Sequence, residues 1–243
     1  MQRRTALAIS VLATGMVSPA HAAATFITSA PYAQFSDSPF LAIGNPNFYL
    51  ETFEDGALNT PGATASAGFV ASPGVFTDSV DADDGVLDGT GNNGHSWYSG
   101  GAASSVSFTF DAGTLGQLPT HVGIVWTDVG NVPGLPLGFD NIAFRAFDQN
   151  DVLLGEIPFN NLGDGVATGG GSAEDRFFAA IFDGGIGRIS ITSLNGSGDW
   201  EVDHLQYGIA AVPVPGAVWM LAPALAGFLG LRRRRGDQYQ SAA

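Results

Sequence analysis

The sequence predicts an all-β fold, an antiparallel β-sandwich of the jelly-roll or lectin-like type, with helices expected only near the two ends of the chain. Glycine and other turn residues interrupt the central segment at short intervals, and no stretch there repeats its apolar residues with a helical period. Between the turns, apolar and polar residues alternate, which is typical of half-buried antiparallel strands. The clearest alternating runs are Val106-Phe108-Phe110, Val122-Ile124-Trp126, Ile142-Phe144-Ala146 and Ile189-Ile191.

The N-terminal region has the three parts of a secretory signal peptide. Arg3 and Arg4 supply a positive start, residues 6–17 are almost wholly apolar, and Ala20-His21-Ala22 fits the small-x-small cleavage rule. We therefore expect residues 1–22 to form a signal helix that is removed. Residues 23–211 are then expected to fold as one β-sandwich domain outside the cytoplasm.

The C-terminal region predicts a single transmembrane helix. Residues 209–231 contain no charged side chain, and residues 216–231 would form a helix about 24 Å long at 1.5 Å per residue. With the preceding apolar residues, this length approaches the thickness of a bilayer core. The helix is followed without a break by Arg232, Arg233, Arg234 and Arg235, which predict a cytoplasmic end by the positive-inside rule. Residues 236–243 would then be a short cytoplasmic tail.

The order of features in residues 212–235 resembles a known sorting signal. Val212-Pro213-Val214-Pro215, the apolar helix and the arginine cluster are together similar to the PEP-CTERM signal of proteins exported by Gram-negative bacteria that make exopolysaccharide. This resemblance implies an exosortase as partner and cleavage near the Pro-x-Pro motif. It also implies a precursor tethered to the inner membrane and a final place at the cell surface or in the extracellular matrix. Val214 stands where the family has glutamate, and an ordinary membrane anchor is the alternative.

The composition between the two end segments is strongly acidic. The chain has no lysine, and residues 23–211 hold only three arginines against 22 acidic residues. Such a surface repels nucleic acid and anionic membranes and attracts divalent cations. The chain also has no cysteine, which excludes disulfides, zinc–thiolate sites and cysteine catalysis within it.

The densest acidic cluster, residues 78–89, predicts a calcium site. Short carboxylates alternate there with glycines, and Ca²⁺ needs about six to eight oxygens around a sharply turning backbone. The spacing is not that of an EF-hand, because an asparagine stands at the twelfth position, where a glutamate is required. The candidate ligands in this cluster are Asp81, Asp83, Asp84 and Asp88, and a solvated acidic loop is the alternative.

Two further carboxylates join this prediction through a second resemblance. An early Phe53-Glu54 turn and a late strand bearing Asp203 are similar to extracellular jelly-roll modules of the carbohydrate-binding and MAM-like type. In those modules the two segments meet, often around a calcium ion. The resemblance therefore implies Glu54 and Asp203 as ligands of Ca²⁺, as an analogy at the level of the fold.

The strand expected at residues 200–207 has an irregular pattern. Val202 would lie on one face of this strand, whereas Leu205 would share the opposite face with Asp203. Either a bulge near His204 switches the parity, or carboxylates point toward a partly apolar side and need a cation or a hydrogen-bonded network. The pattern leaves both interpretations open.

Two patterns bear on sugar chemistry. Trp97 and Tyr98 lie in a glycine-rich run and are candidate sugar-stacking residues, although an aromatic residue between glycines can also close one end of a sandwich. Glu201 and Asp203 are spaced as in the Glu-x-Asp core of laminarinase-like glycosidases. The acid/base glutamate of that pattern is missing, because Gln206 cannot donate and recover a proton. We therefore expect no enzymatic activity.

These features together predict an exported, non-enzymatic protein of the cell surface or extracellular matrix. Calcium is its candidate stabilising ion, and exopolysaccharide or biofilm its expected setting. A lectin-like carbohydrate-binding module is the alternative, and a glycoside hydrolase is a third hypothesis. No nucleic-acid partner is expected. His95, His121 and His204 lie in different segments, and each is expected to make local hydrogen bonds.

Overall fold

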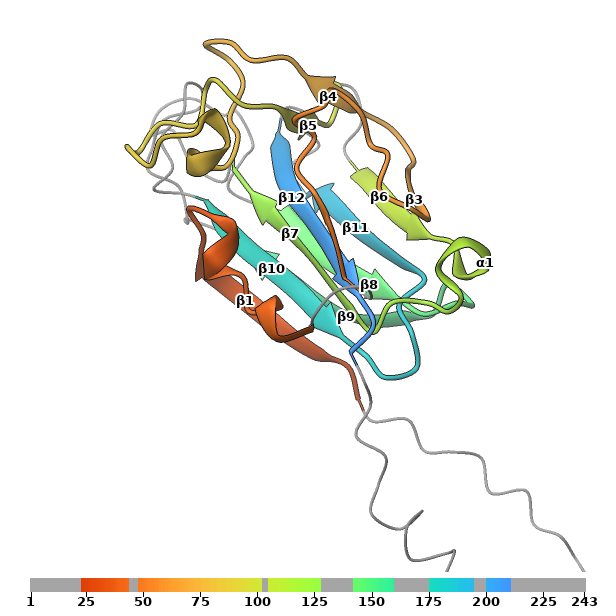
Figure 1. Cartoon of the computed structure of the whole chain (residues 1–243). Coiled ribbons are helices and arrows are strands. Elements are labelled where there is room, and N and C mark those ends of the chain that lie inside the picture. The colour runs from red at the N-terminus through yellow and green to blue at the C-terminus, as the bar shows by residue number, and fades with distance from the viewer. Residues whose placement is uncertain are drawn as a thin grey trace, which may run out of the picture.

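Two antiparallel sheets form the computed structural model, which describes residues 23–43, 48–101, 105–127, 142–159, 175–194 and 200–210 (Figure 1). The larger sheet has the spatial order β1 (Thr25–Pro31), β10 (Arg176–Ile181), β7 (His121–Trp126), β12 (Glu201–Gly208), β5 (Ser96–Tyr98) and β4 (Phe69–Ala71), and β2 (Phe48–Glu51) also pairs with β12. The smaller sheet has the order β3 (Ala63–Ala65), β6 (Ser105–Phe110), β11 (Arg188–Ser193), β8 (Ile142–Phe147) and β9 (Leu153–Phe159). The predicted antiparallel sandwich is confirmed, and its finer jelly-roll assignment stays a prediction.

Helices are short in the part of the chain that the structure describes. They are α1 (Ala112–Leu115) and three 3₁₀ turns, η1 (Phe35–Asp37), η2 (Leu41–Ile43) and η3 (Asp81–Asp84). None of these described helices is long and apolar enough to cross a membrane. The signal helix of residues 1–22 and the transmembrane helix predicted in residues 212–235 lie outside the described residues and stay predictions.

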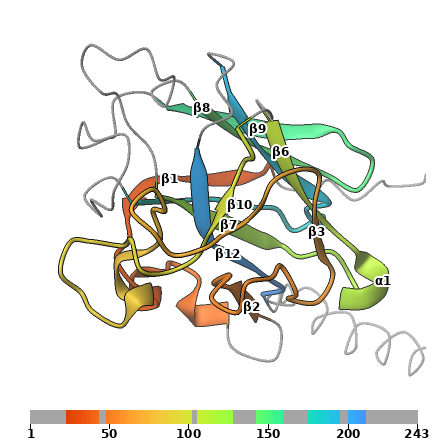
Figure 2. The ribbon, with the colours of Figure 1, turned by 90° about the horizontal axis from the view of Figure 1, so that it is seen from above.

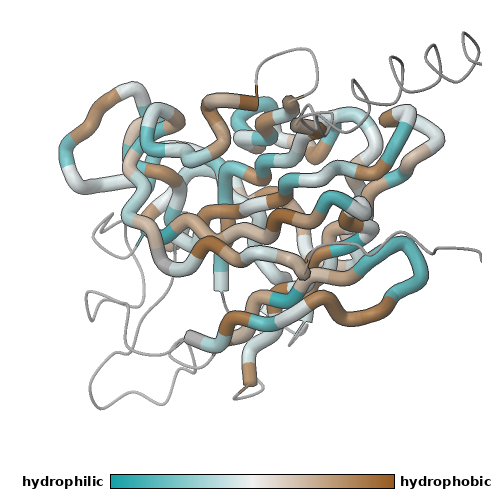
Figure 3. The backbone as a smooth tube through the Cα atoms, turned by 90° about the horizontal axis from the view of Figure 1, so that it is seen from below, coloured by the Kyte–Doolittle hydropathy of each residue, from teal (hydrophilic) through white to brown (hydrophobic). Residues whose placement is uncertain are grey.

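Figure 2 shows the strands of the two sheets from above. The core lies between the sheets, and both contribute apolar side chains to it. All four alternating runs identified in the sequence are strands, β6, β7, β8 and β11. Along β6, Val106, Phe108 and Phe110 are buried while the intervening residues are partly or fully exposed, as expected of a half-buried strand. Figure 3 shows the hydrophobic residues recurring along neighbouring strands.

The outer face of the larger sheet carries a second, smaller apolar cluster. Tyr32, Phe40 and Val80 pack there against Val125 of β7 and Phe177 of β10. Because this layer covers the sheet, β7 is buried on both faces, not on one as the alternating pattern suggested. The segment after β1 and the segment before η3 therefore cover the outer face of the larger sheet.

Both ends of the described domain lie at one end of the sandwich. Across the larger sheet Thr25 pairs with Ile181, Ile181 with His121, and His121 with Gly208. The start of β1 and the end of β12 accordingly lie together at the lower end of Figure 1. The opposite end, where β12 begins at Glu201, is covered by the long loop between β4 and β5.

Candidate functional site

A β-bulge in β12 interrupts the pairing with β7. Asp203 lies opposite Val125 and Gln206 lies opposite Gly123, so β12 has one more residue than its partner between these positions. Within the bulge, His204 has a φ of 43°, in the left-handed region that few non-glycine residues adopt. The bulge is therefore a local departure from regular strand geometry.

The bulge changes which face each side chain of β12 occupies. Val202 and Leu205 both pack into the core between the sheets, so the two residues between them lie together on the outer face. Asp203, His204 and Gln206 thus face the covering segments instead of alternating. The sequence left open a bulge near His204 or a buried carboxylate, and the structure has both. The bulge switches the parity at His204, and the Asp203 carboxyl is fully buried.

The outward-facing polar side chains of β12, Glu201, Asp203, His204 and Gln206, form a polar row. The segment before η3 lies along this row and is hydrogen-bonded to it. The backbone N–H of Asp78 donates to the Glu201 carboxylate at 2.5 Å, and the N–H of Val80 donates to the Asp203 carboxyl at 2.9 Å. Two buried acidic side chains therefore find backbone donors in the segment that covers them. η3 follows directly, so its position over β12 is fixed by the same contacts.

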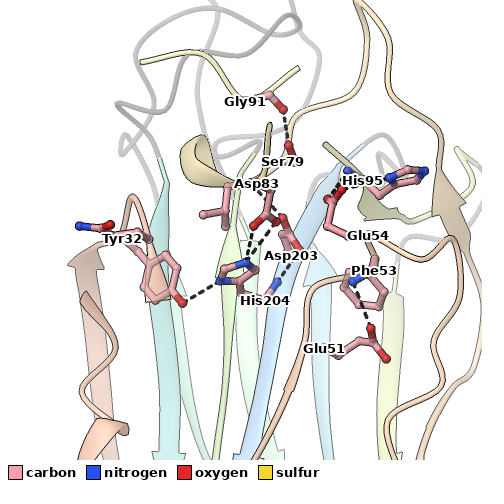
Figure 4. A network of polar contacts seen from close by, with 12 residues as sticks. Tyr32, Glu51, Phe53, Glu54, Ser79, Asp83, Gly91, His95, Asp203 and His204 are labelled. Atoms are coloured by element: carbon pink, nitrogen blue, oxygen red, sulfur yellow. Dashed lines mark hydrogen bonds and ion pairs between the residues drawn. The ribbon is translucent and has the colours of Figure 1, made fainter. Parts of the chain in front are cut away.

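The imidazole ring of His204 is hydrogen-bonded at both nitrogens (Figure 4). Nε2 lies 2.9 and 3.1 Å from the two carboxylate oxygens of Asp83, and Nδ1 lies 2.7 Å from the hydroxyl of Tyr32. The Gln206 amide donates to the same hydroxyl at 2.9 Å, and the Ser38 hydroxyl donates to the Gln206 amide oxygen. Because a carboxylate only accepts hydrogen bonds, Nε2 is the donor to Asp83, and Nδ1 of the neutral ring then accepts from the Tyr32 hydroxyl.

The electrostatic environment of this network opposes further negative charge. Burial, and then the nearby Asp83 carboxylate, raise the pKa of Asp203 well above its usual range. Burial, and then Asp203 and Asp83, likewise raise the pKa of the Tyr32 hydroxyl. Both shifts follow from placing two carboxyl groups close together in a poorly hydrated region.

Asp83, Asp203 and His204 form a group that could hold a metal ion. Each offers one ligand atom, and these three atoms all lie within 4.8 Å of one another. Asp83 and Asp203 are two of the predicted calcium ligands, whereas His204 was expected to make only local hydrogen bonds. Its partners Tyr32 and Asp83 instead lie far away in the sequence.

The predicted six-carboxylate set does not meet in one metal-ligand group among the described residues. Asp81 uses one oxygen to accept the N–H groups of Asp88, Gly89 and Thr90, so it stabilises the loop that follows η3. Asp84 and Asp88 accept local N–H groups as well, at exposed or partly exposed positions. The loop geometry thus directs these carboxylates to its own backbone, whereas Asp83 and Asp203 lie together with His204. The six-residue calcium set stays a prediction.

Glu54 lies at the same end of the sandwich, next to the Asp83 group (Figure 4). A Cβ atom added at Gly94 would lie 3.0 Å from Glu54 Oε1 and 3.0 Å from Asp83 Cβ, so Gly94 passes between these two side chains. Glu54 accepts the backbone N–H of His95 at 2.6 Å and lies 3.3 Å from its ring Nδ1. The Phe53-Glu54 turn therefore approaches the site, with Glu54 bound to His95.

The two candidate sugar-stacking residues have different surroundings. Trp97 is buried, packs against Phe53 and Phe108, and donates from its indole nitrogen to a backbone carbonyl. It closes the core in the way that the alternative interpretation described. Tyr98 is only partly buried and makes an edge-to-face contact with Phe69, whose side chain is 55% exposed. The aromatic surface available at this edge is therefore the pair Phe69 and Tyr98.

Sequence reasoning missed three members of the network, Tyr32, Ser38 and Gln206. Tyr32 and His204 are 172 positions apart, and Ser38 and Gln206 are 168 positions apart. No local pattern links such residues. The signal that was present is the parity break around His204, which places polar side chains on a covered face.

Comparisons of this chain with protein-family models, curated proteins and solved structures return no match. The sorting-signal residues Val212, Pro213, Val214, Pro215 and Arg232 to Arg235 lie outside the described residues. Functional assignment therefore depends on the residues and geometry set out above.

Proposed function

We propose that this chain is an exported, non-enzymatic β-sandwich protein of the bacterial cell surface or extracellular matrix. Its tail would tether it to the inner membrane until an exosortase processes it, in the setting of exopolysaccharide or biofilm. The observation that supports this proposal is the position of the domain ends. Thr25 and Gly208, next to the signal-like and tail-like segments, lie at the same end of the larger sheet.

This arrangement suits display from a membrane. With the tail in the bilayer, the end with Thr25 and Gly208 faces the membrane. The end where β12 begins, with the loop between β4 and β5, then faces outward (Figure 1). Exposed apolar side chains occur in that outward loop, including Phe76, which is 76% exposed. Exposed apolar residues away from the anchored end are what a surface protein offers to a partner.

The two acids that suggested a glycosidase support a non-enzymatic role. Glu201 and Asp203 are both buried, and each accepts a backbone N–H from the covering segment. A glycosidic bond must lie between its two carboxyl groups within hydrogen-bonding reach. The covering segment would have to leave β12 before a sugar could reach either acid.

Cysteine labelling tests the location and orientation, because the chain has no natural cysteine. Phe76→Cys would report on the outward loop, and Asp183→Cys, in the turn after β10, on the end near Thr25. In intact cells we expect both variants to react with a small membrane-impermeant maleimide. A bulky maleimide should react faster at position 76 than at position 183 while the tail is in place.

A chain ending before residue 212 is the matched control for the tether. It should leave the membrane fraction and lose the difference between the two labelling rates. If neither cysteine reacts until the cells are lysed, the chain is not exported and the proposal is wrong. If the shortened and full chains fractionate alike, the tail is not a tether.

A lectin-like role is the second candidate, supported by the exposed aromatic pair Phe69 and Tyr98. An open groove lined by residues 56–58 and 63–70 and by Trp97 lies beside this pair. Exposed rings next to a groove can stack on sugars. Binding to a glycan array that is lost in Tyr98→Ala, and kept in Tyr49→Ala on β2, would support this role. A flat array with an intact fold would remove it.

A further inference from the structure

We propose that Asp83, Asp203 and His204 bind a divalent first-row transition-metal ion, with Zn²⁺ as the probe, and that this ion fastens η3 to β12. The proposal goes beyond the surface role above and does not depend on it. The proposed site differs from the calcium site expected from the sequence, which drew on six carboxylate residues, because it is smaller and includes a nitrogen ligand.

The geometry brings three potential ligands together from two distant segments. Asp203 and His204 are neighbours in sequence, and only the bulge places both side chains on the same face of β12. η3 places the Asp83 carboxylate against His204 Nε2. With ligand distances of about 2.0–2.2 Å, a bound ion needs ligand atoms roughly 3–4 Å apart. The observed separations, all within 4.8 Å, are within reach of small side-chain rotations.

The charges around the group also favour a cation. Asp203 is fully buried, and the Asp83 carboxylate lies against the ring of the neighbouring His204. No lysine exists in the chain, Arg145 and Arg188 on the smaller sheet pair with other acids, and Arg176 on β10 donates to the backbone carbonyl of Asp175. Buried carboxylates are stable only when they are neutralised or paired. A divalent ion between them would supply the positive charge.

The ligand types select the class of ion. Ca²⁺ takes about six to eight oxygen ligands at longer distances, and this group offers two carboxylates and one imidazole nitrogen. Imidazole and carboxylate together suit Zn²⁺ and its neighbours in the first transition row. Three protein ligands also leave a position for water on a four-coordinate ion. Asp83 is the most accessible of the three and marks the side from which an ion would enter.

The hydrogen-bonded residues beside His204 have the form of a support for a metal ligand. A metal-bound histidine commonly uses its other ring nitrogen in a hydrogen bond that fixes its orientation. Here the other nitrogen, Nδ1, lies 2.7 Å from Tyr32, which Gln206 and Ser38 hold in turn. An ion bound at Nε2 would leave the contact between Nδ1 and the Tyr32 hydroxyl in place. Tyr32 is therefore a positioning residue for the site.

The test is Zn²⁺ binding by the full chain, purified in detergent and stripped with a chelator. Competition with a chromogenic chelator measures affinity and stoichiometry, and the visible spectrum with Co²⁺ reports whether a nitrogen ligand is present. We expect one ion per chain. We also expect affinity at least roughly 10-fold weaker in Asp83→Asn and His204→Asn, and roughly 10- to 100-fold weaker in Tyr32→Phe. Asparagine is chosen at position 204 because it tolerates the left-handed backbone.

His95→Gln is the matched control, since His95 also pairs with a carboxylate at the same end of the domain but lies outside the group. It should bind Zn²⁺ like the unchanged chain. The proposal is overturned if the chain binds no Zn²⁺, or if Asp83→Asn and His204→Asn, shown to be folded by circular dichroism, bind as tightly as His95→Gln. It is also overturned if Ca²⁺ raises the melting temperature more than Zn²⁺ does, because that result requires an oxygen site.

Discussion

The buried carboxylate of Glu51 holds the loop that carries Glu54. One oxygen accepts the backbone N–H of Phe53 at 3.1 Å, and the other accepts those of Asn59 and Thr60 at 2.9 and 3.0 Å. Phe53 has a φ of 59°, so this loop starts with a strained residue. Glu51 is only 4% exposed, and water has little access to replace these bonds.

Glu51→Gln keeps the shape of the side chain but removes its charge and one accepting oxygen. If the amide oxygen keeps the N–H groups of Asn59 and Thr60, the amide nitrogen faces the N–H of Phe53. Leaving this buried donor without an acceptor costs about 1–3 kcal/mol. The other two bonds change from charge-assisted to neutral, at roughly 0.5–1 kcal/mol each. We therefore expect the free energy of unfolding to fall by about 2–5 kcal/mol.

The assay is denaturant-induced and thermal unfolding of the Glu51→Gln chain beside the unchanged chain. For a domain of this size the predicted loss lowers the melting temperature by roughly 4–20 °C. Glu156→Gln is the control, because Glu156 pairs with Arg145 at a partly exposed position and should cost no more than about 1 kcal/mol. A change in Glu51→Gln as small as that of the control would show that Glu51 does not hold the loop.

Three further predictions concern the larger sheet. Gly123→Ala would place a Cβ atom 2.2 Å from the Phe177 ring, so it should destabilise the fold by about 1–3 kcal/mol in the same unfolding assay. Gly74→Ala is the control, because no atom would lie closer than 3.9 Å to its Cβ, and it should be nearly neutral. Burial raises the pKa of Tyr207 to about 12, so stability should fall as pH rises from about 10 toward 12. Denaturation midpoints against pH should show a shallower alkaline fall in Tyr207→Phe, because Tyr32, whose pKa burial also raises, still contributes to it. Burial lowers the pKa of His121, so the unfolded chain takes up the proton first and stability should fall as pH drops below about 6.5. His121→Gln should reduce this loss of stability at low pH. An unchanged dependence of stability on pH below about 6.5 would contradict the prediction.

The sandwich could be predicted because the information for it is local. Alternation within six residues identifies a strand such as β6, and the turns between strands are marked by glycine. The burial of β7 on both faces could not be predicted in the same way. It depends on Tyr32 and Phe40, which lie far from β7 in sequence and cover its outer face only after the chain has folded.

The site was predicted in part, for a related physical reason. Counting carboxylates in residues 78–89 locates Asp83 but cannot separate it from Asp81, which bonds to its own loop. That separation depends on the direction of each side chain from η3. The ligand role proposed for His204 depends on the bulge, which the sequence indicated only as one of two ways to resolve a broken alternation.

One extra residue in β12 has consequences that reach the loop between β4 and β5. Without the bulge, Asp203 and His204 would point to opposite faces of the sheet, and only one of them could meet the covering segment. With the bulge, the segment from Asp78 to η3 meets three partners on β12. Glu201 and Asp203 accept its backbone N–H groups, and His204 bonds to the Asp83 carboxylate. Exposed Phe76 precedes this segment directly and exposed Leu87 follows η3. Any partner that contacts those apolar side chains therefore contacts a surface whose shape is set by the polar row on β12.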